Sequence, residues 1–98
     1  MDYEDKIFCT YIMSNKVSSV VYTGVTSDLP QRAYVHKNHL LPGFTNKYNA
    51  EKLVWYEIHG SMEAAIKREK RIKKWNREWK EKLINEMNPD WRDLREEL

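Results

Sequence analysis

The sequence predicts an α+β domain: a three-stranded sheet, antiparallel or mixed, flanked by helices in the order β-β-α-β-α-α. Three observations support this prediction. The 98 residues suffice for one small domain, residues 1–98. Segments rich in β-branched and aromatic residues occur in the first quarter and again near the middle. The last forty residues instead show helical periodicity.

The first two strands are predicted over residues 6–14 and 19–25, joined by turn residues 15–18. Both faces of the first strand are largely apolar, which is typical of a central strand. The short connection favours an antiparallel hairpin, so Tyr11 and Tyr22 are expected on neighbouring strands. Gly24 near the end of the second strand indicates a bulge or a place where another backbone or a ligand approaches closely.

A helix is predicted from Pro30 to about Asn38. Asp28 and Gln31 have the spacing of a capping box, and Pro30 falls in the first turn, where a missing N–H does no harm. The helix places Arg32 and His36 one turn apart on one face. Residues 39–49 contain a Pro-Gly pair and no periodicity, so a loop is expected there.

The second half is predicted to form a strand over residues 52–59 and helices over 61–75 and about 76–87. Ser61 is a suitable N-cap for the first of these helices. Its apolar stripe consists of Met62, Ala65, Ile66, Ile72 and Trp75, and its expected solvent face carries Lys67, Arg68, Lys70, Arg71, Lys73 and Lys74. Trp91 is expected to fold back onto the core.

Glu69 interrupts that apolar stripe, three residues after Ile66 and three before Ile72. A carboxylate that loses water there costs several kcal/mol unless a cation or strong donors compensate for it. Two readings stay open at this point: a structural salt bridge, for example with Arg32, or a functional ligand.

Charge and cysteine content narrow the class of protein. Residues 67–82 hold nine Lys/Arg and three acids, a distribution typical of a polyanion binder, although a solvated helix face is the plain alternative. The single cysteine, Cys9, is consistent with a reducing compartment, and no apolar run approaches the length of a membrane span. A cytoplasmic protein without membrane contact is therefore expected.

His36 and His39 alone do not make a zinc site.

The ordered set of site candidates resembles the GIY-YIG nuclease family. Its first motif corresponds to Cys9-Thr10-Tyr11 and its second to Tyr22-Thr23-Gly24; Arg32, His36 and Glu69 follow at the family's spacing. The segments GFTNKYN, REKRIKKW and NPDWRDL resemble the small single-domain bacterial branch, which is similar to the nuclease domain of the excision-repair incision protein. The motifs depart from the family pattern at Cys9, Thr10 and Thr23, which are strand-packing positions. The family's C-terminal asparagine corresponds to Asn76 or Asn88.

The resemblance implies a metal-dependent endonuclease that hydrolyses nucleic-acid phosphodiesters, with DNA as the expected substrate and low sequence specificity. The implied catalytic residues are Tyr11, Tyr22, Arg32, His36 and Glu69, with Glu69 holding one Mg²⁺ or Mn²⁺ ion. Nucleic-acid contacts are expected from Lys47, Lys67, Arg68, Lys70, Arg71 and Lys74, and a protein partner is a possible source of specificity. Two alternatives remain: a nucleic-acid-binding module of the same fold without catalysis, and a protein-interaction domain anchored by Trp75, Trp79 and Trp91.

Overall fold

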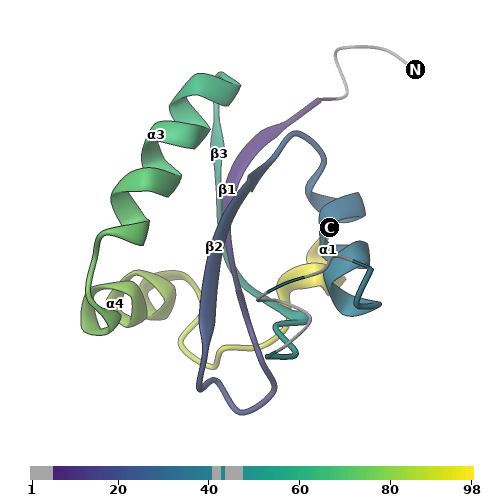
Figure 1. Cartoon of the computed structure of the whole chain (residues 1–98), viewed down its shortest axis with the longest axis vertical. Coiled ribbons are helices and arrows are strands. Elements are labelled where there is room, and N and C mark those ends of the chain that lie inside the picture. The colour runs from purple at the N-terminus through teal and green to yellow at the C-terminus, as the bar shows by residue number, and fades with distance from the viewer. Residues whose placement is uncertain (1–5, 41–42, 44–47) are drawn as a thin grey trace.

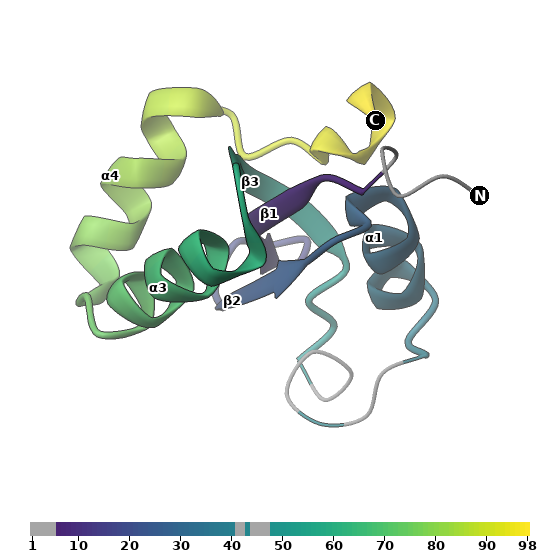
Figure 2. The same ribbon diagram turned by 90° about the horizontal axis from the view of Figure 1, so that it is seen from above.

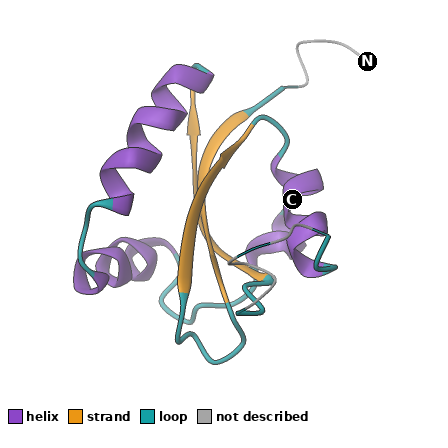
Figure 3. Cartoon of the chain, viewed as in Figure 1, coloured by secondary structure: helices purple, strands orange, loops and turns teal. Residues whose placement is uncertain are grey.

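A computed structural model describes residues 6–40, 43 and 48–98 of the chain. Its sheet is antiparallel, with the strand order β2-β1-β3, so the predicted central position of the first strand is confirmed. The elements follow the predicted order, with one short 3-10 helix added at the end: β1 Phe8–Ser14, β2 Val21–Thr26, α1 Leu29–Lys37, β3 Lys52–His59, α3 Met62–Lys73, α4 Arg77–Met87 and η2 Leu94–Glu97. The α+β prediction is thereby confirmed (Figure 3).

The sheet separates two apolar clusters because alternate residues of β1 point to opposite faces. On one face, Cys9, Tyr11 and Met13 pack with residues from α1, β3 and η2. On the other face, Ile12 packs with Ile72 of α3 and neighbouring residues of β3 and α4. Figures 1 and 2 show the resulting layers, with α3 and α4 on one side of the sheet and α1 with the C-terminal segment on the other. Strand β2 forms the sheet edge between α1 and α3.

Gly24 lies opposite Tyr11 in the continuous β1–β2 register, and the ring of Tyr11 occupies the space that a side chain would need. The close approach is therefore that of a side chain, and not of the backbone or ligand expected from the sequence. In the described part of the chain, the register shift between paired strands lies elsewhere, at Ile12 and Met13 in the β1–β3 ladder.

Gly24→Ala is expected to lower the free energy of unfolding by about 1–3 kcal/mol, the usual cost of overpacking a core. The added Cβ would lie 2.5 Å from the hydroxyl oxygen of Tyr11 and 2.6 Å from its Cζ, and the Tyr11 side chain is buried. Urea denaturation measures the difference. Gly60→Ala is the matched control, because a Cβ at Gly60 meets no atom within 4 Å. Equal stability of Gly24→Ala and wild type would contradict this account.

The two predicted caps form: Asp28 accepts a hydrogen bond from the Gln31 N–H, and Ser61 accepts one from the Ala64 N–H. Asn76, which was not predicted as a cap, accepts one from the Trp79 N–H. Within α3, Ala65 and Ile72 are buried, whereas Ile66 is 37% exposed. The prediction that Ile66 belongs to the buried stripe is therefore wrong, because α3 turns the side carrying Ile66 away from the core centred on Ala65 and Ile72.

The C-terminal segment crosses to the α1 side of the sheet, which the sequence pattern did not predict. Asn88 directs this crossing: its buried side-chain amide donates to the carbonyls of Val54 and Arg92 at 3.0 and 2.8 Å. Trp91 packs against the α3–α4 cluster, as expected, and Leu94 then becomes buried beside Leu53 on the opposite face.

Among the described residues, no helix has both the length and the apolar character needed to cross a membrane.

Candidate active site

The pair at the base of the candidate site is Tyr11 of β1 and His36 of α1. The Tyr11 hydroxyl lies 3.0 Å from Nε2 of His36, and the two rings meet edge to face with centroids 5.6 Å apart. Both side chains are buried, at 1% and 3% exposure. This contact joins two elements that are 25 residues apart in the sequence.

Tyr22 of β2 lies on the same face of the sheet as Tyr11, because it pairs with Met13 two positions along the ladder. Its ring centroid is 5.8 Å from that of His36. Unlike Tyr11, Tyr22 is only partly buried. Of the two tyrosines, Tyr22 is thus the one whose side chain reaches the surface.

Arg32 acts on both members of the buried pair. Its charge favours the ionised form of Tyr11 and disfavours the protonated form of His36. Its guanidinium therefore lies near enough to both side chains to shift their protonation equilibria.

Burial controls the protonation of this pair. It raises the pKa of Tyr11 far above its ordinary value, and the nearby Tyr22 and Glu69 add to this rise while Arg32 opposes it. Burial also lowers the pKa of His36 to about 4, and the Arg32 charge contributes in the same direction. At neutral pH, Tyr11 is therefore a neutral phenol beside a neutral imidazole.

His36 is expected to make the protein less stable in mild acid. Between pH 6.5 and about 4 the unfolded chain binds a proton that the folded protein excludes, so stability is full above pH 6.5 and falls below it. The free energy of unfolding should drop by about 2 kcal/mol from pH 7 to pH 5. Urea denaturation across this range measures it, and His36→Gln should flatten the dependence. An equal slope in wild type and variant would refute the prediction.

Glu69 of α3 completes the group. Its carboxylate is only 15% exposed, as its place in the apolar stripe predicted, and it raises the pKa of the Tyr11 hydroxyl by its charge. The cation that balances it is Lys73, whose Nζ lies 2.6 Å from Oε2 of Glu69. A salt bridge therefore forms, but its partner is Lys73 and not the suggested Arg32.

Lys73 is the residue of this site that sequence reasoning missed. Its ammonium also lies 5.7 Å from the centroid of the Tyr22 ring, so it links α3 to β2. The expectation that Lys73 lies on the solvent face agrees with its 47% exposed side chain, but its contacts with Glu69 and Tyr22 were not expected. The available signal was its position four residues after Glu69, the spacing of a helical ion pair.

The donors present fit a hard divalent cation better than a soft one. Within the described ranges, no cluster of three or more His, Cys, Asp and Glu side chains is found. The single carboxylate of Glu69 suits Mg²⁺ or Mn²⁺, which retain several waters and need few protein ligands when a phosphate supplies the rest. A structural zinc site needs four such ligands.

The predicted nucleic-acid contacts lie in different environments. Lys70, Arg71 and Lys74 are exposed on α3, and Lys67 is exposed in an ion pair with Glu63. Arg68 differs from the prediction of a solvated residue: it bonds to Glu57 at 3.0 Å and stacks between the rings of Trp55 and Trp75, with 21% of its side chain exposed. Lys47 lies outside the described residues.

Neither candidate for the family's asparagine contacts the tyrosine–histidine pair. Asn76 caps α4, and Asn88 is buried and bonded to the backbone. Both asparagines thus have structural roles in the described part of the chain.

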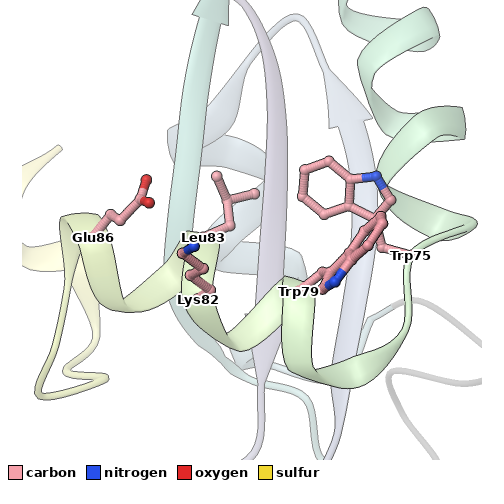
Figure 4. Close-up of a pocket in the computed structure, with 5 residues that line it drawn as sticks. All are labelled: Trp75, Trp79, Lys82, Leu83 and Glu86. Carbon is pink, nitrogen blue, oxygen red and sulfur yellow. The ribbon is translucent and has the colours of Figure 1, made fainter.

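A separate pocket of about 310 Å³ lies between the end of α3 and α4 and shares no residue with the candidate site; its lining residues are Trp75, Trp79, Lys82, Leu83 and Glu86 (Figure 4). Trp79 is 57% exposed and meets Trp75 edge to face. Trp75 and Trp91 instead pack against the buried cluster. Of the three tryptophans considered as anchors for a protein partner, Trp79 alone has a mainly exposed side chain.

The fold and the grouping of these side chains define a small α+β domain with a candidate site beside the edge strand of an antiparallel sheet. A phenol pair from a hairpin, a helical arginine and histidine, and a carboxylate from a later helix meet there. A family model, the GIY-YIG catalytic domain, matches residues 7–82. The chain therefore belongs to the GIY-YIG family of nuclease domains.

Relatives of similar size support this assignment. A UPF0213 protein of Staphylococcus saprophyticus is 36% identical over 76 residues, covering 78% of this chain and 92% of the relative. A UPF0213 protein of Staphylococcus epidermidis is 33% identical over 82 residues, covering 84% and 98%. The solution NMR structure of a UPF0213 protein from Bacillus halodurans superimposes with a TM-score of 0.55 at 27% identity, covering 87% of this chain and 89% of that one.

Proposed function

We propose that this protein is a metal-dependent endonuclease that hydrolyses phosphodiester bonds of nucleic acid, with DNA as the expected substrate and low sequence specificity. The observation that carries the proposal is the convergence of Tyr11, Tyr22, Arg32, His36 and Glu69 from four different elements. Membership of a nuclease family supports it independently.

Arg32 would hold the phosphate that is cleaved. A guanidinium keeps its charge at all relevant pH values and presents paired donors that match phosphate oxygens. In the free protein its charge already acts on both Tyr11 and His36, so it lies at the centre of the group.

The two phenols would have different tasks. Tyr22 reaches the surface and would orient or deprotonate the attacking water. Tyr11 is buried and holds His36, so it acts as a positioning residue for α1. This division follows from exposure, since a group that handles a water molecule has to be accessible to it.

A bound Mg²⁺ or Mn²⁺ ion would supply stabilisation of the negative charge that develops on the phosphate and on the leaving oxygen. Glu69 would hold it, because its charge acts on the Tyr11 hydroxyl. Its ion-pair partner Lys73 also lies near the Tyr22 ring. The exposed lysines and arginines of α3 would contact phosphates further along the strand. Sequence specificity would have to come from a protein partner. A cytoplasmic location belongs to this proposal and is supported by the free thiol of buried Cys9.

The test is nicking of supercoiled plasmid by the purified protein with Mg²⁺ or Mn²⁺, with EDTA, and with the Arg32→Ala variant. Nicking that requires the metal and falls strongly in the variant is the expected result. Absence of nicking, or equal nicking by the variant, would contradict the proposal that this protein is an endonuclease.

The Glu69–Lys73 pair favours one alternative, a binding module of the same fold without catalysis. Because Lys73 already balances the carboxylate, the fold does not require a metal at this position. This alternative predicts salt-sensitive DNA binding that Glu69→Ala leaves unchanged, with no cleavage under any metal. Binding and nicking assays on the same preparation separate the two functions.

A further inference from the structure

We propose that Lys73 couples metal binding to nucleic-acid binding: its ammonium occupies the Glu69 carboxylate in the free protein and transfers to a phosphate of the bound strand, which frees the carboxylate for the metal. The inference rests on the proposed function and adds a regulatory step to it. Nucleic acid would thus raise the affinity of the site for metal, and metal would raise its affinity for nucleic acid in equal measure.

The contacts of Lys73 place it where a metal bound by Glu69 would lie. Its Nζ is 2.6 Å from Oε2 of Glu69 and 5.7 Å from the centre of the Tyr22 ring. The carboxylate is 15% exposed, whereas the lysine side chain is 47% exposed. The buried partner is therefore the fixed one, and the lysine is the partner that has room to move.

Two cations cannot share this carboxylate without cost. A divalent ion on Glu69 would lie close to the Lys73 ammonium, and like charges at short distance repel. The approach of a metal therefore favours displacement of the lysine, while the lysine weakens the binding of the metal.

A phosphate offers the displaced ammonium a second partner in a region of positive potential. Burial lowers the pKa of Lys80 of α4, and the charges of Arg77 and Lys73 contribute in the same direction, so both cations lie near Lys80. Arg77 is held in place by Glu81 and by the carbonyls of Ser18 and Ser19 in the β1–β2 hairpin. The charge of Arg77 therefore stays near Lys80 whichever partner Lys73 takes. A strand that approaches Arg32 and Tyr22 would bring its phosphates to this corner.

The experiment measures Mn²⁺ binding by paramagnetic broadening of amide signals around Glu69, with and without a cleavage-resistant phosphorothioate DNA duplex. In the wild type, the duplex is expected to lower the Mn²⁺ dissociation constant by about tenfold, within the usual range of coupling between sites. In Lys73→Met, Mn²⁺ should bind the free protein more tightly, and the duplex should no longer change its affinity. Lys73→Arg keeps the charge and should retain most of the coupling.

Lys82→Met is the matched control. It removes the same charge from an exposed lysine of α4 that lines the separate tryptophan pocket and belongs to no part of the candidate site, and it should leave the coupling at the wild-type value. Unchanged coupling in Lys73→Met, with Mn²⁺ still broadening the signals near Glu69, would overturn this inference and leave the proposed function intact. No broadening near Glu69 in any variant, with or without DNA, would overturn the metal-dependent function itself.

Discussion

Glu69→Gln is expected to reduce the rate of phosphodiester cleavage by roughly 10²–10³, which corresponds to about 3–4 kcal/mol of barrier. The amide keeps the shape of the side chain but removes the charge that holds a metal and that balances Lys73. Because this carboxylate is the proposed ligand of the metal, the variant should also lose the affinity for Mn²⁺. Nicking rates measured at saturating metal determine the size of the effect.

Glu63→Gln is the control for this prediction. Glu63 lies on the same helix and also pairs with a lysine four residues later, but its side chain is 80% exposed and belongs to no part of the site. It should cleave DNA at nearly the wild-type rate. A Glu69→Gln enzyme as active as Glu63→Gln would show that the carboxylate has no role in catalysis.

Tyr22→Phe is expected to lower kcat by about 10²–10⁴, the usual contribution of a positioned proton-transfer group, with little effect on folding. Tyr22 is partly exposed, unlike the buried Tyr11, so loss of its hydroxyl is expected to cost less folding stability. Parallel measurements of nicking rate and urea denaturation separate the loss of activity from any loss of stability.

Tyr11→Phe is the informative comparison because it removes the same atom from a buried phenol. His36 would lose its hydrogen-bond partner, at a cost of about 1–3 kcal/mol of folding stability, while cleavage should fall less than in Tyr22→Phe. The opposite pattern, with cleavage lost in Tyr11→Phe and retained in Tyr22→Phe, would reverse the assignment of the two tyrosines.

Comparison of the predicted and observed positions of the α3 residues shows how far helical periodicity predicts a site. The apolar stripe correctly placed Glu69 in a poorly hydrated position, and the capping residue Ser61 marked the start of the helix. The same pattern wrongly buried Ile66, and it did not indicate that the exposed Lys73 pairs with Glu69. Periodicity gives the angle of a residue around its own helix, but the rotation of the helix against the sheet decides which edge of the stripe is covered.

The sequence by itself determined the order of the elements, the two apolar faces of β1, the caps of α1 and α3, and the membership of the candidate residues in one family pattern. These depend on local spacing, which the chain carries directly. The tertiary structure alone decided that Tyr11 is buried against His36 while Tyr22 reaches the surface. It also decided that Lys73 pairs with Glu69 and that Arg68 pairs with Glu57. Each of these depends on how α1 and α3 pack around the edge strand β2, because burial and ion pairing are set by neighbours that lie far away in the sequence.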